Sequence, residues 1–214
     1  MKAVFTCGGT GGHINPALAV ARVLLERRPD SEILFVGAED GMEATLVPRE
    51  GFRLETLQIS SYMRSLKPSA IRHNVRAALS IRRALKKADR IIRDFQPDVI
   101  LGTGGYASYP MLHEGARLGI PTAVHESNAV PGLATKMVAD KVDRILVSFA
   151  DSRSAYRDPS RVIAVGMPVR EEFVFTRRAD ARRALGLNEK TPMIVSAWGS
   201  LGAREMNKKI AQFM

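Results

Sequence analysis

Residues 3–16 read AVFTCGGTGGHINP, a short apolar run followed by four glycines and a proline. The run at 3–6 predicts a buried strand, and the glycines after it allow a tight turn. Asn15 is suited to cap a helix and Pro16 to occupy its first position. Such a passage from strand to helix offers free N–H groups and the positive end of a helix dipole, which together favour an anion.

Two later stretches repeat this order of residue types. They read LGTGGYASYP at 101–110 and AWGSLGAR at 197–204. Because loops at the carboxyl ends of parallel strands meet along one edge of the sheet, we expect all three to face a common ligand crevice. Three such loops in one chain favour the binding of a phosphate or another anion over three plain turns.

Short apolar runs alternate with helical stretches along the chain. We expect strands at 3–6, 33–36, 99–101, 122–125, 145–148, 162–165 and 193–197, and helices at 16–28, 42–50, 69–95, 110–118, 132–139, 179–185 and from 204 onward. This alternation predicts an α/β fold with a mostly parallel, Rossmann-like sheet. We place one domain at 1–165 and a linker with the start of an incomplete second domain at 166–214, since one strand with its flanking helices cannot close a core.

The composition is that of a globular protein. The 214 residues are 45% apolar and 25% charged, with one cysteine, Cys7. A single cysteine excludes an internal disulfide framework and is typical of a reducing compartment. No apolar run approaches the roughly 20 residues of a spanning helix, and the N-terminus lacks a signal-peptide core. We therefore expect a cytosolic location, or one on the cytosolic side of a membrane.

The positive charge is concentrated in one segment. Residues 64–93 carry ten Lys and Arg against one acid, Asp89, and so account for nine of the net charge of +10. The helical stretch 69–95 has an apolar face and a basic one, which contains Arg72, Arg76, Arg83, Lys87 and Arg90. This face is a candidate contact surface for an acidic partner, with a simple solvated face as the alternative. It lacks the interleaved aromatics of a nucleic-acid site, so we expect no nucleic-acid partner.

Other enzyme classes fit the motifs less well. The stretch 9–14 begins like a dinucleotide fingerprint but ends in Ile14 instead of glycine, although Glu39 imitates the acid that grips an NAD ribose. No Gly-Lys-Ser/Thr phosphate loop occurs. The pairs at 113–114 and 125–126 start like His-Glu-x-x-His, but Arg117 and Ala129 replace the second histidine, so we expect no metal site.

Taken together, these segments resemble the MurG family, the peptidoglycan UDP-N-acetylglucosamine:lipid I glycosyltransferases. The matching stretches are GGTGGHINPALA at 8–19, GTGGYASYP at 102–110, HESN at 125–128 with Pro131-Gly132, VGMPVR at 165–170 and GSLGA at 199–203. The resemblance implies the GT-B arrangement of two Rossmann-like domains facing a cleft. It also implies an inverting transfer of N-acetylglucosamine from UDP-N-acetylglucosamine to the muramoyl C4 hydroxyl of lipid I, without a cofactor, at the cytoplasmic face of the membrane.

The resemblance also implies roles for single residues. It places Thr10, Gly11 and Gly12 along the donor and diphosphate region, Asn128 on the donor-sugar side, and Arg170 and Ser200 on the donor diphosphate. Gly104 and Gly105 would bind substrate, and Tyr106 and Ser108 would position the lipid diphosphate. His13 is the candidate base, because imidazole titrates near neutrality and the residue lies at a helix start. Glu126 is the rival base or a partner of His13, and His13 acting only as a hydrogen-bond partner is the alternative.

The basic segment then becomes a membrane contact. Arg72, Arg76, Arg83 and Lys87 suit peripheral docking on an anionic lipid surface. The family pattern is broken at Ser127, Met167, Trp198 and Leu201, and much of its donor-binding domain lies beyond 214. We therefore expect this chain alone not to transfer sugar, although the full-length protein would. The alternatives are a non-catalytic lipid-binding module and another GT-B enzyme, such as a lipid glycosyltransferase or a sugar-nucleotide epimerase.

Overall fold

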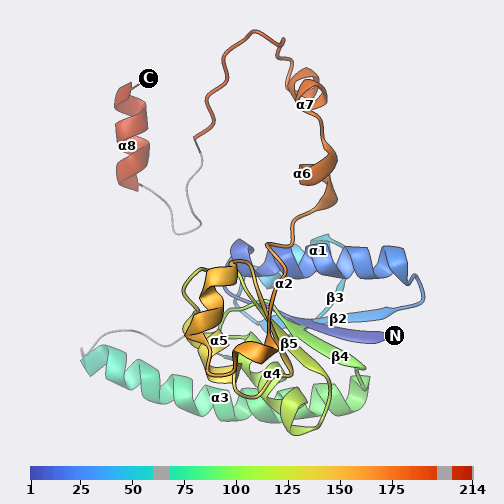
Figure 1. Cartoon of the computed structure of the whole chain (residues 1–214). Helices are drawn as coiled ribbons and strands as arrows, with labels where there is room; N and C mark the ends of the chain where they lie inside the picture. Colours follow the sequence, from blue (N-terminus) through green and yellow to red (C-terminus); the bar gives the residue numbers. More distant parts are fainter. Residues whose placement is uncertain (60–67, 197–203, 214) are drawn as a thin grey trace. The chain divides into compact units, whose positions relative to one another are not determined.

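The computed structural model describes residues 1–59, 68–196 and 204–213, and the side chains of 68–79 and 172 are not described. The chain divides into two compact units, Met1–Arg170 and Glu171–Met214 (Figure 1). The first unit extends five residues beyond 165, the boundary expected from the sequence, and it contains the sheet.

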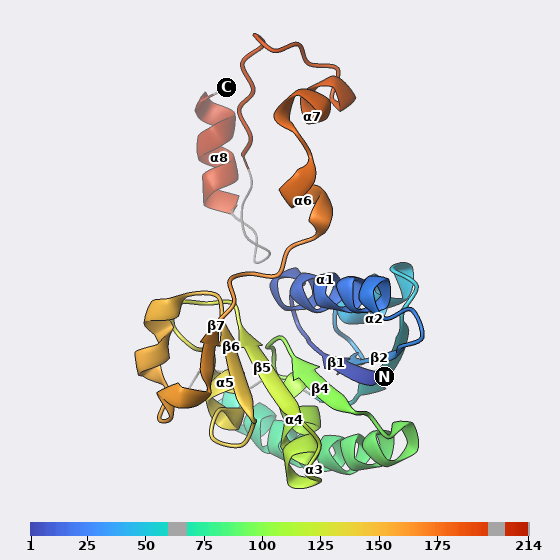
Figure 2. The ribbon, with the colours of Figure 1, turned by 45° about the vertical axis from the view of Figure 1, so that its right-hand side comes forward.

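The strands of the described residues form one seven-stranded sheet. They are β1 (Lys2–Thr6), β2 (Glu32–Ala38), β3 (Arg53–Leu57), β4 (Val99–Gly102), β5 (Thr122–Glu126), β6 (Arg144–Val147) and β7 (Val162–Ala164). They lie in the order β3-β2-β1-β4-β5-β6-β7, with every neighbouring pair parallel (Figure 2). The strand order reverses between β1 and β4, and sheets of this kind bind ligands at that reversal.

Helices cover both faces of the sheet (Figures 1 and 2). One face carries α1 (Gly11–Arg27) and α2 (Glu43–Arg49), and the other carries α3 (Pro68–Phe95), α4 (Ser108–Arg117) and α5 (Leu133–Val138). Two short 3-10 helices, Ala150–Ala155 and Pro159–Arg161, precede β7. Successive strand residues point to opposite faces, so Val4 joins the core under α3 and α4 while Phe5 joins the core under α1. No described helix combines the length and the apolar character needed to cross a bilayer.

The predicted α/β class with a parallel Rossmann-like sheet is confirmed. The strands expected between residues 3 and 165 are all present. The sequence analysis missed β3, whose sequence RLETL mixes polar and apolar residues. It is an edge strand with most of its residues only partly buried, and such a strand lacks the continuous apolar run of its neighbours.

The start of α1 differs from the prediction. The helix begins at Gly11, after Thr10 in extended conformation, so Asn15 does not cap it and Pro16 lies inside it. The turn ends earlier than expected because Gly9 adopts a positive φ of 88°. Pro16 is the sixth residue of this helix, so its missing N–H leaves the Gly12 carbonyl without the usual intrahelical donor. This extra turn places His13 in the first turn of α1.

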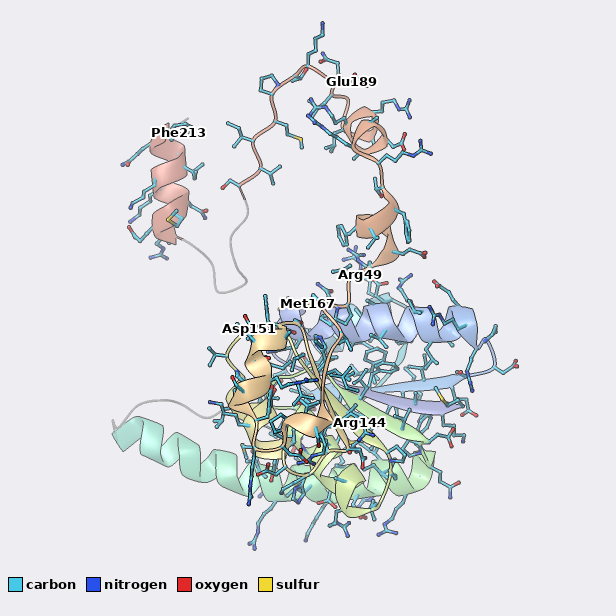
Figure 3. The ribbon with its side chains drawn as sticks, in the orientation of Figure 1. Arg49, Arg144, Asp151, Met167, Glu189 and Phe213 are labelled. Carbon is cyan, nitrogen blue, oxygen red and sulfur yellow. The ribbon has the colours of Figure 1, made fainter. Side chains whose placement is uncertain are left out.

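The second unit is built from α6 (Glu171–Phe175), α7 (Arg178–Ala184) and α8 (Arg204–Phe213). The strand predicted at 193–197 is wrong over its described part, since residues 193–196 have no regular structure. No strand occurs elsewhere in the described part of this unit, so these apolar residues have no ladder to join. Ile194 and Val195 are accordingly exposed, as is Phe213 at the end of α8 (labelled in Figure 3).

Candidate active site

The two glycine loops of the first unit meet at the reversal of the strand order. The loop after β1 and the loop after β4 are joined by a hydrogen bond from the Thr103 N–H to the Thr6 carbonyl (3.0 Å). The Thr103 hydroxyl donates to the His13 carbonyl (2.6 Å). These bonds tie the first turn of α1 to the end of β4. The crevice expected from the glycine spacing is therefore present for these two loops.

The contact between the loops is made by backbone and leaves no room for side chains. A Cβ atom at Gly105 would lie 2.1 Å from the Gly8 carbonyl oxygen, and Gly105 has a φ of +81°. Gly104, with φ +101°, faces the His13 ring, and a Cβ there would lie 2.8 Å from its Cδ2. Both positions thus require glycine for the backbone conformation and for space.

The His13 ring is oriented by this loop. Its Nδ1 lies 3.0 Å from the Gly8 carbonyl oxygen and 3.4 Å from the Thr10 hydroxyl. Because a carbonyl oxygen can only accept, Nδ1 carries the proton of the neutral ring. The other nitrogen, Nε2, lies on the side of Gly104 and keeps a free lone pair. This is the tautomer that a general base needs.

A buried carboxylate shapes the first glycine loop, and the sequence analysis missed it. Glu43, at the start of α2, is fully buried. Its Oε1 accepts from the Ala38 N–H (2.7 Å) and its Oε2 from the Gly9 N–H (3.2 Å). Glycines at 8, 37 and 41 surround it so closely that a Cβ on any of them would come within 3.0 Å of it. The sequence offered one signal, the two glycines, Gly37 and Gly41, that shortly precede it.

Two groups beside Glu43 are held in their neutral forms. Burial, and then the Glu43 charge, raises the pKa of the Cys7 thiol, so Cys7 is a packed thiol and no nucleophile. Burial, followed by the carboxylates of Glu43 and Asp40, also raises the pKa of Tyr106. The Tyr106 hydroxyl is therefore a hydrogen-bond donor, and its ring lies against Gly9.

Glu126 holds the loop between β5 and α5. Its Oε1 accepts from the backbone N–H of Asn128 (2.9 Å) and from its Nδ2 (2.8 Å), and its Oε2 accepts from the Gly132 N–H (2.9 Å) and the Thr135 hydroxyl (2.6 Å). Burial acts to raise its pKa, but these hydrogen bonds outweigh it and hold the pKa of Glu126 below its usual value. A carboxylate has about four acceptor positions, and all of them are filled here.

The same hydrogen bonds orient Asn128. Since its Nδ2 donates to Glu126, its amide oxygen is the end left to accept from a ligand. The Asn128 residue is exposed. An amide oxygen fixed in this way suits the hydroxyl or acetamido N–H groups of a sugar.

These loops border one pocket of about 240 Å³. Its loop side is lined by His13, Gly104, Gly105, Tyr106, Glu126, Asn128 and Gly132. Its helix side is lined by Ile81 of α3, Tyr109 of α4 and Leu133, Ala134, Thr135 and Met137 of α5, and Ile59 joins them from the segment after β3. The sequence analysis missed the helix side, because its apolar residues read as ordinary core positions. No group of three or more His, Cys, Asp or Glu able to hold a metal occurs in the parts of the chain that are described.

Other predicted site residues lie apart from the pocket lining. Ser108 is buried, and its hydroxyl donates to the Gly105 carbonyl (2.7 Å), so it braces the second glycine loop. Thr10, Gly11 and Gly12 lie beside His13 at the start of α1, and Arg170 ends the first unit. Ser200 lies outside the described residues, as do the side chains of Arg72 and Arg76. Arg83 and Lys87 are exposed on α3 beside Glu39, Thr56 and Gln58.

The sequence of this first unit matches a known family model. Residues 3–147 match the glycosyltransferase family 28 N-terminal domain. The chain belongs to glycosyltransferase family 28. The predicted MurG membership is confirmed by relatives named UDP-N-acetylglucosamine–N-acetylmuramyl-(pentapeptide) pyrophosphoryl-undecaprenol N-acetylglucosamine transferase. The relative from Acetivibrio thermocellus is 40% identical over all 214 residues, and that from Caldanaerobacter subterraneus is 39% identical. The chain spans 57% and 58% of their lengths.

Solved structures agree with the family 28 fold. MurG from Acinetobacter baumannii superposes with a TM-score of 0.62 at 24% identity, over 79% of this chain and 46% of that one. UDP-GlcNAc 2-epimerase from Neisseria meningitidis, bound to UDP-GlcNAc, superposes with a TM-score of 0.56 at 15% identity, over 78% and 46%. At these identities the likeness concerns the fold alone, and both enzymes share it.

Proposed function

We propose that residues 1–170 are the acceptor-side domain of an inverting glycosyltransferase. The reaction moves N-acetylglucosamine from UDP-N-acetylglucosamine to the muramoyl C4 hydroxyl of the lipid-linked acceptor, lipid I. The acceptor oxygen bonds to C1 of the donor sugar while the bond from C1 to the diphosphate oxygen breaks. The acceptor proton passes to a base, and UDP leaves with the negative charge. Relatives that align with the whole length of this chain carry both substrates in their names, and this supports the substrate pair.

The orientation of His13 is the observation that supports the chemistry best. Its Nδ1 proton is engaged by the Gly8 carbonyl, so Nε2 can take the acceptor proton at the pocket. Glu126 is the weaker candidate, because a carboxylate with four hydrogen bonds and a lowered pKa is a poor proton acceptor. We therefore assign the base to His13 and the shaping of the Asn128 loop to Glu126.

The remaining roles follow from position. The N–H groups of Gly11 and Gly12 precede the first intrahelical bonds of α1, so they can bind a diphosphate oxygen together with the helix dipole. The Tyr106 hydroxyl is a donor for the acceptor diphosphate, and the Asn128 amide oxygen accepts from the donor sugar. Arg170, at the end of the first unit, would hold the donor diphosphate.

A chimaera tests the function directly. Residues 1–170 of this chain replace the matching segment of the Acetivibrio thermocellus relative, which supplies the rest of the enzyme. We expect the chimaera to form the disaccharide-lipid product from UDP-N-acetylglucosamine and lipid I. His13→Ala in the chimaera lowers kcat by about 10² to 10⁴ with little change in KM for the donor. His13→Gln should not rescue it, because an amide accepts no proton at neutral pH.

The control for the chimaera is the parental enzyme carrying the same histidine substitution. A folded chimaera that binds lipid I but forms no product would instead favour the non-catalytic lipid-binding module. A His13→Ala chimaera with nearly normal kcat would remove His13 from the base role.

We further propose that α3 docks the domain on the anionic, cytoplasmic surface of the membrane. Its described basic side chains are exposed, at Arg82, Arg83, Lys86, Lys87 and Arg90. The opposite side of the helix is buried against the core through Ala84, Ala88 and Ile92. A cationic row on α3, the helix that also contributes Ile81 to the pocket, would bring a lipid-linked acceptor to the membrane side of the domain. Each basic residue near such a surface adds about 1 kcal/mol.

Vesicle binding tests the membrane role. Reversal of two charges, Arg82→Glu with Lys86→Glu, should weaken binding to vesicles with phosphatidylglycerol by at least tenfold. The matched control reverses Arg27 and Arg28, which are exposed at the end of α1 on the other face of the sheet. Equal losses from the two pairs, or binding that ignores the anionic lipid content, would contradict the proposal.

A further inference from the structure

We propose that the buried His125 is a positioning residue, which holds Arg170 in place through the backbone carbonyl of Gly166. The inference rests on the proposed function, in which Arg170 binds the donor diphosphate. His125 lies on β5 directly before Glu126 and is not among the residues that line the pocket. Its part in the reaction is therefore indirect, because it acts on the chain segment that carries Arg170.

The His125 ring contacts the segment that follows β7, two strands away in the sheet (Figure 2). Its Nε2 lies 3.0 Å from the Gly166 carbonyl oxygen. The Ser148 hydroxyl lies 3.3 Å from that nitrogen and 3.4 Å from that oxygen. Because a carbonyl oxygen can only accept, Nε2 carries the ring proton and donates the bond. We call this contact of His125 and Ser148 with Gly166 the Gly166 clamp.

The clamp leaves one polar atom unsatisfied. His125 is 1% exposed, and within the described part of the chain its buried Nδ1 has no hydrogen-bond partner. An unpaired polar atom in the interior destabilises a fold, and an apolar side chain would avoid it. Burial lowers the pKa of His125, so the ring is neutral at about pH 7. The bond from Nε2 to Gly166 accounts for a polar ring at this buried position.

The clamp acts where the chain leaves the sheet. β7 ends at Ala164, and the next N–H, that of Val165, still donates to the Val147 carbonyl (3.0 Å). Gly166 follows with a φ of +76° and with nothing within 4 Å of its Cβ position, so side-chain packing does not fix it. Residues 165–170 have no regular structure. The bond to the Gly166 carbonyl thus ties the start of this segment to the sheet.

The position of Arg170 depends on this tie. Arg170 follows Gly166 by four residues, which span at most about 14 Å when extended, so a shift at Gly166 is passed on to Arg170. A guanidinium binds phosphate through a planar fork of donors, and this geometry tolerates little displacement. The diphosphate assigned to Arg170 is that of the donor. We therefore expect the clamp to govern the binding of UDP-N-acetylglucosamine and not that of lipid I.

The chimaera tests this role, because it contains the whole clamp and Arg170. His125→Leu removes the donor at Nε2 and keeps the site apolar. We expect the KM for UDP-N-acetylglucosamine to rise about fivefold or more and the KM for lipid I to stay within about twofold. His125→Gln should restore the KM for the donor to within about twofold, because its amide N–H can donate to the Gly166 carbonyl.

A double-variant cycle tests whether His125 acts through Arg170. Arg170→Ala alone should raise the KM for UDP-N-acetylglucosamine by about tenfold or more. When residue 170 is already alanine, His125→Leu should add less than about twofold, since the group that it positions is absent. A full further increase in that background would overturn the inference.

Hydrogen–deuterium exchange on the purified chain measures the clamp without substrate. His125→Leu should speed amide exchange at residues 165–170 by about tenfold, and His125→Gln should leave it within about threefold. The matched control is Val124→Ala, which is buried on the same strand but packs in the core under α3 and α4. It should leave exchange at 165–170 unchanged. If His125→Leu does not fold, Ser148→Ala removes the hydroxyl of the clamp and should speed the same exchange by about threefold.

The clamp and the transferase function fail separately. Faster exchange at residues 165–170 together with an inactive chimaera would refute the function and keep the anchoring of this segment. In an active chimaera, equal rises in the two KM values, or no recovery with His125→Gln, would overturn the positioning role and keep the function. Unchanged exchange in both His125→Leu and Ser148→Ala would overturn it as well.

Discussion

Two loops border the pocket, and they are held by opposite means. The glycine loop after β1 is packed backbone against backbone on the second glycine loop, with Gly105 directly over the Gly8 carbonyl. The β5–α5 loop is held by one side chain, the Glu126 carboxylate, through four hydrogen bonds. The first arrangement excludes side chains from the contact between the loops. The second uses up hydrogen-bond donors of the loop, among them the N–H groups of Asn128 and Gly132.

This difference decides where an anion can bind. Glu126 accepts the N–H of Gly132, the residue that precedes α5, and so acts as a resident anion at that helix start. At α1, Glu43 takes only the Gly9 N–H and leaves the first-turn N–H groups at Gly11 and Gly12 for a ligand. Of these two helix starts, the structure therefore favours α1 for the substrate diphosphate.

Gly105→Ala should have the largest effect on this arrangement. The new Cβ clashes with the Gly8 backbone at a positive φ, so we expect the free energy of unfolding to fall by about 3 kcal/mol or more, measured by urea denaturation. Gly51→Ala is the control, since Gly51 has a φ of +82° with nothing within 4 Å of its Cβ position. It should cost only about 1 kcal/mol. Equal losses would mean that the close approach of the two loops does not hold them.

Glu126→Gln should have the next largest effect. The amide replaces one acceptor oxygen with a donor, which leaves two donors of the β5–α5 loop without partners. We expect a loss of about 2–3 kcal/mol. Glu32→Gln is the control, because Glu32 is exposed and only 3.6 Å from Lys2 in a surface pair, where the change should be within about 0.5 kcal/mol. A loss at Glu126 no larger than at Glu32 would show that the loop does not depend on the carboxylate.

Glu43→Gln should destabilise less than Glu126→Gln. Its amide oxygen can still accept from Ala38, one donor at Gly9 is lost, and a buried charge is removed. We expect a loss of about 1 kcal/mol, again from urea denaturation. The reverse order of the two variants would indicate that the glycine loop relies on its carboxylate more than on backbone packing.

The pH dependence of Glu126 should be the smallest of these effects. Because the pKa of Glu126 is lowered in the folded state, its ionisation stabilises the fold above the unfolded pKa of about 4.3. This contribution is lost as the pH falls through the folded pKa. The gap in stability between the protein and Glu126→Gln should therefore shrink below about pH 4. A gap that is constant from pH 7 to pH 3 would contradict the assigned role.

The sequence predicted the parts of the site that local rules govern. Glycine spacing and strand ends located His13, Gly104 and Tyr106 correctly at one crevice, because parallel strands bring their carboxyl ends to one edge. The family resemblance at HESN, and no local rule, pointed to Asn128, which lines the same pocket. Local rules also predicted the strands that are buried on both faces, whose continuous apolar runs are easy to recognise.

The missed features depend on tertiary contacts. Glu43 is separated by 34 positions from the Gly9 N–H that it accepts, and no local pattern connects them. The early start of α1 depends on the backbone of Gly9, against the usual rule for Pro16. Apolar residues on the helix side of the pocket, such as Ile81 and Met137, are of the same types as core residues, and only their position at a pocket distinguishes them.

The place of β1 in the sheet has a consequence for synthesis of the protein. β1 ends at Thr6, and its neighbour β4 begins at Val99. At about 5–20 residues per second, ribosomes need roughly 5–20 seconds to make the intervening chain. During that interval β1 can pair with β2 while its other edge stays open, and such edges invite aggregation. The pocket cannot exist until β4 docks, so nascent chains stalled before this point carry the glycine loop but no binding site.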